Sequence, residues 1–344
     1  MAEGKTEIRT DLYDLDSLLI HYVPFTGSGS AQEAPEKQRR TLALPQRVRC
    51  SLSEPNVYLL DKAQFRLDNG PWQEVQELLR ADNVLREYLG WPSRQASVAQ
   101  PWTIQEERAE HTVQLRFTVE CAAPVADTWL ALEDAQAAAI TCNGVLVTAK
   151  PEGWYVDKSI GKVFLGDLKE GTNIIEVTLP FGLRTNVEWC YLLGDFGVEV
   201  AGQYRWLVPA RKLLGWDDVT KQGLAHYGGN ITYHIPFTTS GGNVRLTVPH
   251  YAGAAVRAEL DGRKEIIAYP PYMVELGQLP AGEHELKLTL LGNRRNSFGA
   301  VHLADSKHSW HGPDAWRTEG SRWTESYRLV PLGILSAPVM EEEV

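Results

Sequence analysis

Carboxyl groups are the side chains in this sequence that could break a glycosidic bond. The reaction needs two of them, one on either side of the bond and roughly 5 to 10 Å apart. Adjacent acidic pairs occur at Glu106-Glu107, Glu133-Asp134 and Asp217-Asp218. Neighbouring residues on a strand point to opposite faces, so these pairs are poor candidates for an acid and a base. We interpret them as solvated loop charge and predict no catalytic residue.

Aromatic and planar polar residues suggest a second chemistry, carbohydrate binding. A pyranose ring packs its C–H face on Trp or Tyr, while amide, guanidinium and carboxylate groups pair with its hydroxyls. The predicted carbohydrate-binding residues are Asn293, Arg294, Arg295, Asn296, Trp310, His311, Trp316, Arg184, Asn186, Glu188 and Trp154. The alternative is that the aromatics join packed domains, with the Arg and Asn side chains capping strand ends.

Metal and cofactor sites are not predicted. His302, Asp305, His308 and His311 lie close in sequence, but the histidine spacings of six and three residues match neither HExxH nor a zinc finger. No EF-hand loop, P-loop, dinucleotide-binding glycine pattern or G-x-S-x-G turn is present.

Short alternating stretches must position these residues. Residues 231–237, 244–248, 255–260, 265–269 and 284–291 alternate with a period of two between Gly, Asp-Gly and Pro-Pro turn signals. The same order precedes them at 112–119, 128–133, 137–142, 145–149 and 173–179. Asn143-Gly144 and Asp261-Gly262 are matching hairpin turns. This internal repeat predicts an all-β protein with two tandem antiparallel sandwiches.

The repeat also predicts domain boundaries. Residues 1–53 contain N-terminal strands, around 8–25, and a flexible linker. Residues 54–201 form sandwich 1, with one short helix near 73–89 that Gly90 and Pro92 end. A connector at 202–226 leads to sandwich 2 at 227–344. Matching 191–198 to 327–334 as the closing strands leaves an inserted loop at 297–323, and we expect the acidic tail after Pro338 to be disordered.

Composition limits the partners. The chain has 344 residues and a net charge of −10 with scattered Lys and Arg, which argues against nucleic acid. No apolar run could cross a membrane, and the polar start is no signal peptide, so the sequence as written predicts a cytoplasmic protein. The four cysteines, Cys50, Cys121, Cys142 and Cys190, show no CxxC spacing and are expected to be buried free thiols.

Several separated strings resemble one family. EPNVYLLDKAQFRLDNGPWQ (54–73), LGWPSRQASVAQPW (89–102), RTNVEWCYLLGDFGVEV (184–200), DDVTKQGLAHYGGNITYHIPF (217–237) and GNRRNSFGAVH (292–302) resemble the C-terminal region of large bacterial α-L-rhamnosidase-like glycoside hydrolases. The resemblance spans roughly residues 54–334. It implies jelly-roll sandwiches of the galactose-binding type behind an N-terminal catalytic barrel.

In that family the catalytic carboxylates belong to the barrel, so no catalytic residue is carried over to this sequence. The resemblance implies a non-catalytic, carbohydrate-binding or accessory region, whose partner could be a catalytic domain, a separate subunit or a second copy. Two alternatives stay open: a complete glycoside hydrolase with its site between the sandwiches, and a purely structural or interaction module.

Overall fold

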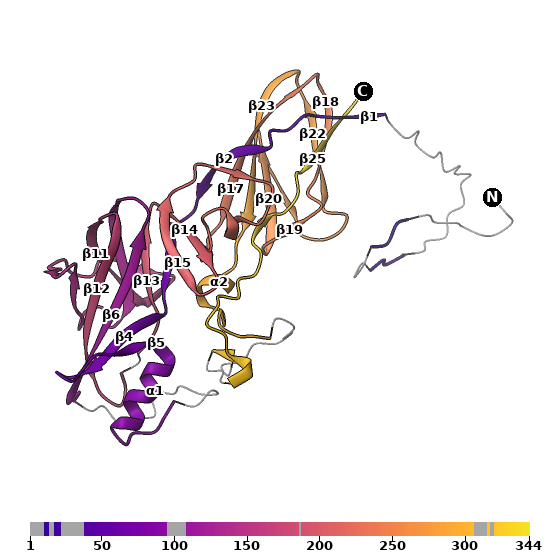
Figure 1. Cartoon of the computed structure of the whole chain (residues 1–344). Coiled ribbons are helices and arrows are strands. Elements are labelled where there is room, and N and C mark those ends of the chain that lie inside the picture. Colours follow the sequence, from indigo (N-terminus) through magenta and orange to yellow (C-terminus); the bar gives the residue numbers. More distant parts are fainter. Residues whose placement is uncertain are drawn as a thin grey trace.

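A computed structural model describes residues 10–13, 17–21, 38–94, 108–185, 187–305, 315–316 and 320–344. Figure 1 shows two β-sandwiches joined by several crossing segments, with little helix. Within the described ranges the strands pair antiparallel, except that β15 meets β6 in parallel at Leu207 and Cys121, and an isolated parallel bridge joins Val198 to Leu224. The predicted all-β class is confirmed.

Sandwich 1 has two sheets. The first has the order β10 (Trp154–Tyr155), β11 (Asp157–Leu168), β7 (Val125–Glu133), β13 (Cys190–Gly194) and β3 (Asn56–Leu60). The second has the order β14 (Phe196–Ala201), β15 (Tyr204–Pro209), β6 (His111–Cys121), β12 (Gly171–Phe181), β8 (Ala139–Cys142) and β9 (Val145–Leu146). In the same sheet β4 (Lys62–Leu67) pairs with β6 and with β5 (Gln73–Glu77).

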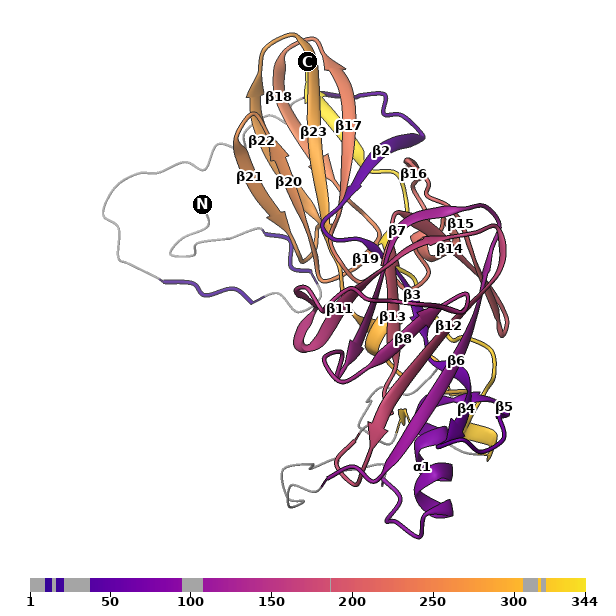
Figure 2. The same ribbon diagram turned by 90° about the vertical axis from the view of Figure 1, so that its left-hand side faces the viewer.

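Sandwich 2 also has two main sheets, whose strands run lengthwise through the upper part of Figure 2. One has the order β16 (Leu213–Gly215), β2 (Arg47–Leu52), β17 (Ile231–Thr239), β23 (Gly282–Leu291), β20 (Ala255–Leu260) and β21 (Arg263–Ile267). The other has the order β1 (Arg39–Thr41), β25 (Val339–Glu343), β18 (Gly242–Thr247) and β22 (Met273–Leu279). A short pair, β19 (Tyr251–Ala252) with β24 (Gly333–Ile334), lies beside them.

The alternation in the sequence explains the cores. Along β6 and β12 every second side chain is buried, and the two strands pair over 11 residues from Gly171↔Cys121 to Phe181↔His111. Each sandwich buries its own apolar cluster, one around Phe117 and Leu192 and the other around Tyr233 and Leu288. The hairpin turns have the predicted positive φ, 51° and 78° at Asn143 and Gly144, and 49° and 83° at Asp261 and Gly262.

The chain enters sandwich 2 before it builds sandwich 1. β1 and β2 lie within residues 1–53 but pair with β25 and β17 of sandwich 2. The chain then forms sandwich 1 from β3 onward, and β15 and β16 lie within the span predicted as a connector. Of the strands predicted at 8–25, the described residues 10–13 and 17–21 lie outside any strand, and the rest of that span lies outside the described residues.

The helix prediction is wrong at its start. α1 (Leu78–Tyr88) begins five residues after position 73, because Gln73–Glu77 pair with β4 as strand β5. Glu77 caps the helix by accepting hydrogen bonds from the backbone N–H groups of Leu79 and Arg80. The predicted stop at Gly90 is confirmed. Gly90 has a φ of +70°, and the N–H groups of Gly90 and Trp91 bond to the carbonyls of Glu87 and Arg86.

The predicted end of sandwich 2 is also wrong. Tyr327–Pro331 lie outside strands, and the tail expected to be disordered is strand β25. β25 pairs with both β1 and β18, so it occupies the interior position that β13 holds between β3 and β7 in sandwich 1. Met340 and Glu342 are fully buried there. The tail is therefore a framework strand.

Candidate functional site

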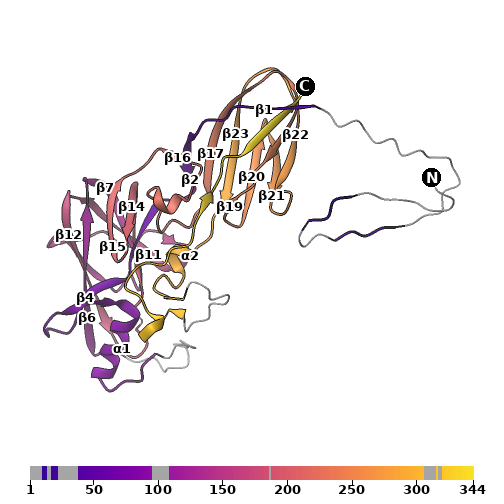
Figure 3. The same ribbon diagram turned by 45° about the vertical axis from the view of Figure 1, so that its right-hand side comes forward.

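The described residues between β23 and β24 lie mainly on sandwich 1. Figure 3 shows this part of the chain leaving sandwich 2 and running past α2 (Arg295–Phe298) towards α1. The ring of Phe298 stacks on Tyr155 and Tyr191 of sandwich 1, with centroids 5.9 and 4.9 Å apart. Val301 and Tyr327 belong to the same core cluster. We call the described residues among 293–332, namely 293–305, 315–316 and 320–332, the clamp segment.

The four predicted sugar-binding residues at the start of the clamp segment, Asn293 to Asn296, all make contacts within the chain. Asn296 is buried, and its amide bonds to the backbone N–H and C=O of Val330 at 2.9 and 2.8 Å. Asn293 accepts a hydrogen bond from the N–H of Arg295, which lies in the first turn of α2. These contacts hold the chain path, and they leave a role in sugar binding a prediction.

Arg294 links the clamp segment to the stretch between β2 and β3. Its guanidinium makes a bidentate ion pair with Glu54, with 2.7 Å between Nη2 and Oε2. It also lies over the ring of Tyr155, with 5.8 Å to the centroid. A bidentate pair fixes both groups, so Glu54 has a defined position beside the cleft described below.

Only some of the aromatic residues of the predicted inserted loop lie in the described part of the chain. Trp310 and His311 lie outside the described residues. Trp316 is half-buried and donates its indole N–H to the carbonyl of Phe298 at 2.9 Å. Trp323 lies under the guanidinium of Arg80, 4.5 Å from its centroid, and against the ring of His302. Among the described loop residues, the two indoles thus make packing contacts.

The predicted residues of sandwich 1 differ in their exposure. Arg184 is exposed, Glu188 is half-buried, and Asn186 lies outside the described residues. The neighbouring Trp189 is buried and donates its indole N–H to Glu77. Trp154, by contrast, is 54% exposed on the β10–β11 hairpin, with Lys158 5.8 Å from its ring centroid. It is the member of this group that offers an open aromatic surface.

A buried charge network that the sequence analysis missed joins the clamp segment to sandwich 1. Asp61, fully buried, pairs with Arg205 and accepts hydrogen bonds from Tyr327 (2.9 Å) and His302 (2.7 Å). Burial alone would raise the pKa of Asp61, but Arg205 and His302 outweigh it and lower that pKa to about 2. The four residues are far apart in sequence, so no local spacing could have indicated the network.

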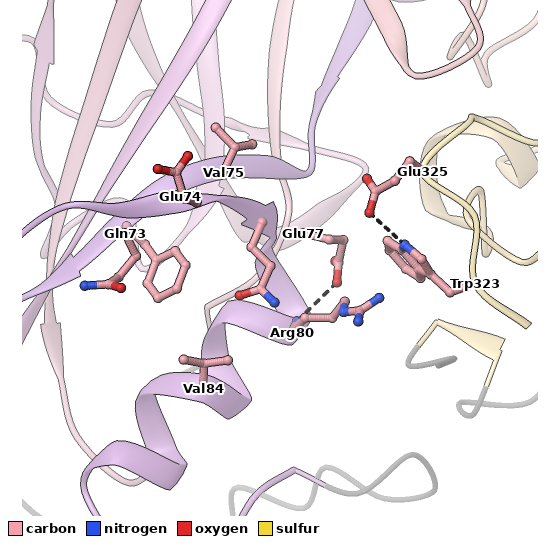
Figure 4. A pocket seen from close by; sticks show the side chains of 10 residues that line it. Gln73, Glu74, Val75, Glu77, Arg80, Val84, Trp323 and Glu325 are labelled. Carbon is pink, nitrogen blue, oxygen red and sulfur yellow. Dashed lines mark hydrogen bonds between the residues drawn. The ribbon is translucent and has the colours of Figure 1, made fainter. Parts of the chain in front are cut away.

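A first cleft, of about 370 Å³, lies between β5, α1 and the end of the clamp segment (Figure 4). Burial raises the pKa of Glu77, while hydrogen bonds from Lys62 and Trp323 overcome burial and lower the pKa of Glu325. Opposite shifts are the pattern of an acid and a base. Glu77, however, is only 2% exposed and already accepts from two helix N–H groups and from Trp189, so its contacts are those of a helix cap.

A larger cleft, of about 620 Å³, lies between the two sandwiches, and we call it the inter-sandwich cleft. One wall is Cys50 and Leu52 of β2, and the opposite wall includes Trp129 of β7 and the β13–β14 turn. At its base the buried Asn56 donates to the carbonyls of Phe196 and Gly223 at 2.7 and 2.9 Å. Its volume falls in the range of small-molecule sites, about 300–1,000 Å³.

Trp129 gives this cleft an aromatic wall. The ring is half-buried, meets Phe164 edge-on at 5.2 Å and has Lys162 at 5.2 Å from its centroid. Its indole N–H has no hydrogen-bond partner among the described residues, although Trp189, Trp216, Trp316 and Trp323 all donate theirs. An unpaired donor on an aromatic surface can serve a ligand hydroxyl.

A β-bulge shapes the same wall. Thr128 pairs with Gly166 and Val125 with Leu168, so Ala126 and Asp127 together face the single residue Asp167. Asp127 has a φ of +54°, and its N–H bonds to the carboxylate of Asp167 at 3.0 Å. Bulges of this kind bend a strand and re-aim its side chains, and both bulge residues line the cleft.

The other charged residues of the cleft are paired. Asp195 pairs with Lys212 at 3.0 Å, Arg211 with Glu199 at 2.7 Å, and Glu54 with Arg294. Gln222 uses its amide in bonds to the backbone of Gly215 and Asp217. The cleft therefore offers Trp129 and Asp127 as its unpaired aromatic and carboxylate groups within the part of the chain that the structure describes.

No group of three His, Cys, Asp or Glu side chains in the described ranges could hold a metal ion. The four cysteines are free thiols, three of them buried, and burial raises the pKa of Cys190 to about 12. Across the described residues, no helix is both long and apolar enough to cross a membrane.

Comparisons with known proteins do not assign a family. The sequence matches no described protein family and no curated protein. Among solved structures, it is similar to a rhamnosidase from Novosphingobium sp. PP1Y, with 14% identity and a TM-score of 0.29, over 69% of this chain and 23% of that one. It is also similar to an exo-chitosanase from Amycolatopsis orientalis, with 11% identity and a TM-score of 0.27, over 70% of this chain and 29% of that one.

A GH2 beta-galacturonidase from Eisenbergiella tayi has 10% identity and a TM-score of 0.27, over 69% of this chain and 36% of that one. This chain thus spans about a quarter to a third of the length of these enzymes. TM-scores below 0.3 do not define a shared fold, so these likenesses place the chain in no family.

Proposed function

We propose that this protein is a non-catalytic, carbohydrate-binding β-sandwich protein and that a saccharide occupies the inter-sandwich cleft. The observation that carries the proposal is that Trp129 and Asp127 both lie on one wall of a cleft of about 620 Å³. Together they supply an aromatic surface, a free N–H donor and a carboxylate acceptor, which are the groups that recognise a pyranose ring and its hydroxyls.

The resemblance in sequence to the accessory region of rhamnosidase-like glycoside hydrolases supports a saccharide as the ligand. Under this proposal the chain serves a glycoside hydrolase as a binding or accessory region, with jelly-roll sandwiches of the galactose-binding type. Of the predicted residues, the exposed Trp154 and Arg184 on sandwich 1 then make secondary contacts with the saccharide, while Asn293 and Asn296 hold the clamp segment in place. Arg294 acts indirectly in this scheme, because it holds Glu54 at the edge of the cleft.

Calorimetry with a panel of neutral oligosaccharides, the rhamnose-containing ones included, tests the proposal. Trp129→Ala should weaken binding at least about tenfold, the loss typical of one aromatic stacking contact. Tyr204→Ala is the matched control, because Tyr204 is a 67% exposed aromatic outside the cleft. Trp154→Ala tests the site predicted from sequence. Unchanged binding in Trp129→Ala with loss in Trp154→Ala would move the site to the β10–β11 hairpin.

A second candidate is a glycoside hydrolase. Glu77 and Glu325 line one cleft with pKa values shifted in opposite directions, but Glu77 is engaged as a helix cap, so Glu325 is the carboxylate left to test. Hydrolysis of a panel of aryl glycosides by the purified chain tests it. Turnover that Glu325→Gln abolishes would overturn the non-catalytic proposal. Saccharide binding without hydrolysis would support the non-catalytic proposal. The third candidate, a structural or interaction module, predicts neither binding nor turnover.

A further inference from the structure

We infer that the inter-sandwich cleft prefers a saccharide bearing a free amino group and disfavours an acidic saccharide, with Asp127 as the specificity-determining residue. The inference rests on the proposed function, because it assigns the ligand class of the same cleft. It follows from the charges of the cleft and from the backbone that presents Asp127.

The charges of the cleft cancel except at one residue. Five charged residues line it, and four of them have a partner of opposite sign: Glu54 with Arg294, Asp195 with Lys212, Lys212 with Asp195, and Arg211 with Glu199. The carboxylate of Asp127 has no ion pair and no side-chain hydrogen bond among the described residues, and it is exposed. Among the residues that line the cleft, a ligand therefore meets one charge without an ion-pair partner, the carboxylate of Asp127.

The backbone places that charge two residues before Trp129 in the lining of the cleft. In a regular strand, one residue would face Asp167, but here the bulge inserts Asp127 in the left-handed region with a φ of +54°. This conformation is uncommon for residues other than glycine, although Asp and Asn tolerate it best. Asp127 is thereby exposed while Thr128 is buried and Trp129 is half-buried. The carboxylate of Asp127 and the indole of Trp129 thus lie two residues apart on one wall of the cleft.

An ammonium group on a sugar packed against Trp129 would pair with Asp127, and a charge-assisted hydrogen bond is stronger than a neutral one. A sugar carboxylate in the same position would meet a like charge instead. We expect an amino saccharide to bind about tenfold more tightly than its N-acetylated counterpart, and an acidic one to bind more weakly than either.

Calorimetry at pH about 6, where an amine is protonated, compares chitosan, chitin and galacturonan oligosaccharides of equal length on the wild-type chain and on Asp127→Asn. Asn accepts the same backbone conformation, so this variant should fold. It should keep binding of the chitin oligosaccharide and lose the preference for chitosan. Asp127→Gly is a second variant, because glycine suits a φ of +54° without strain and removes the carboxylate.

Three results would overturn the inference. Equal binding of chitosan and chitin oligosaccharides by the wild type would overturn the preference while leaving the proposed carbohydrate function in place. A preference that persists in Asp127→Asn and Asp127→Gly would overturn the role of Asp127. Absence of binding to any saccharide, including the neutral panel, would overturn the proposed function itself.

Discussion

The Nε2 atom of His302 lies 2.7 Å from Oδ2 of Asp61, a residue 241 positions earlier in the chain. The other ring nitrogen lies 2.9 Å from the backbone carbonyl oxygen of Thr324. Asp61 thus lies between Arg205 and His302, and the His302 ring bridges Asp61 of sandwich 1 and Thr324 of the clamp segment. This arrangement holds the clamp segment on sandwich 1.

Replacing Asp61 by Asn should destabilise the protein by about 3–5 kcal/mol, because Arg205 would remain buried without a countercharge and His302 would lose its carboxylate partner. The measurement is urea unfolding at neutral pH. Lys264→Ala breaks a more exposed ion pair with Glu259 and serves as the control, with an expected change within about 0.5 kcal/mol. Equal losses in the two variants would contradict a structural role for the network.

Stability should fall in acid in two steps. Burial and the nearby Arg205 lower the pKa of His226 from 6.5 to about 4, so the folded protein keeps His226 neutral at neutral pH. Between pH 6.5 and 4 the unfolded chain binds a proton at His226 and the folded protein does not. The free energy of unfolding therefore falls by about 3 kcal/mol across this range. Asp61, with its pKa lowered from 3.8 to about 2, adds a loss between those values.

His226→Phe should remove the first step, because Phe takes up no proton. The exposed His250 provides the matched control, and His250→Phe should leave the slope between pH 6.5 and 4 unchanged. Urea unfolding at several pH values gives the slope. If His226→Phe retains the wild-type slope, another group is responsible for it.

The C-terminal strand should contribute strongly to stability. Met340→Ala removes a fully buried side chain from β25 and should cost about 2–5 kcal/mol in thermal or urea unfolding. Val339→Ala changes the adjacent residue, which is 39% exposed, and should cost much less. A disordered tail would make both substitutions silent.

Glu77→Ala should destabilise sandwich 1 by about 2–3 kcal/mol, because it removes the cap of α1 and leaves the indole N–H of the buried Trp189 without a partner. Glu87→Ala, at an exposed position on the same helix, is the control. Thermal unfolding followed by tryptophan fluorescence reports both effects. If the contacts of Glu77 did not stabilise the protein, Glu77→Ala and Glu87→Ala would unfold at the same temperature.

Local chemistry was sufficient to predict much of the framework. Alternation along 112–119 and 231–237 predicted β6 and β17, because burying one face of a sheet requires a period of two. Asn143-Gly144 and Asp261-Gly262 predicted their turns, because few residues accept positive φ. Where local signals conflicted with pairing, the prediction was wrong: Val75, Leu78 and Leu79 have helical spacing, yet Gln73–Glu77 is a strand because β4 offers an edge.

The acidic strand β25 and the candidate site depended on tertiary structure. Glu342 is tolerated inside a sheet because Thr239, Ser240 and Arg40 surround its carboxylate, and no residue near it in sequence indicates those partners. The exposure of Asp127 arises from a mismatch between β7 and β11, which is a property of a strand pair and not of either strand. The residue types were present in the sequence, but the contacts that give them a role join positions that only folding brings together.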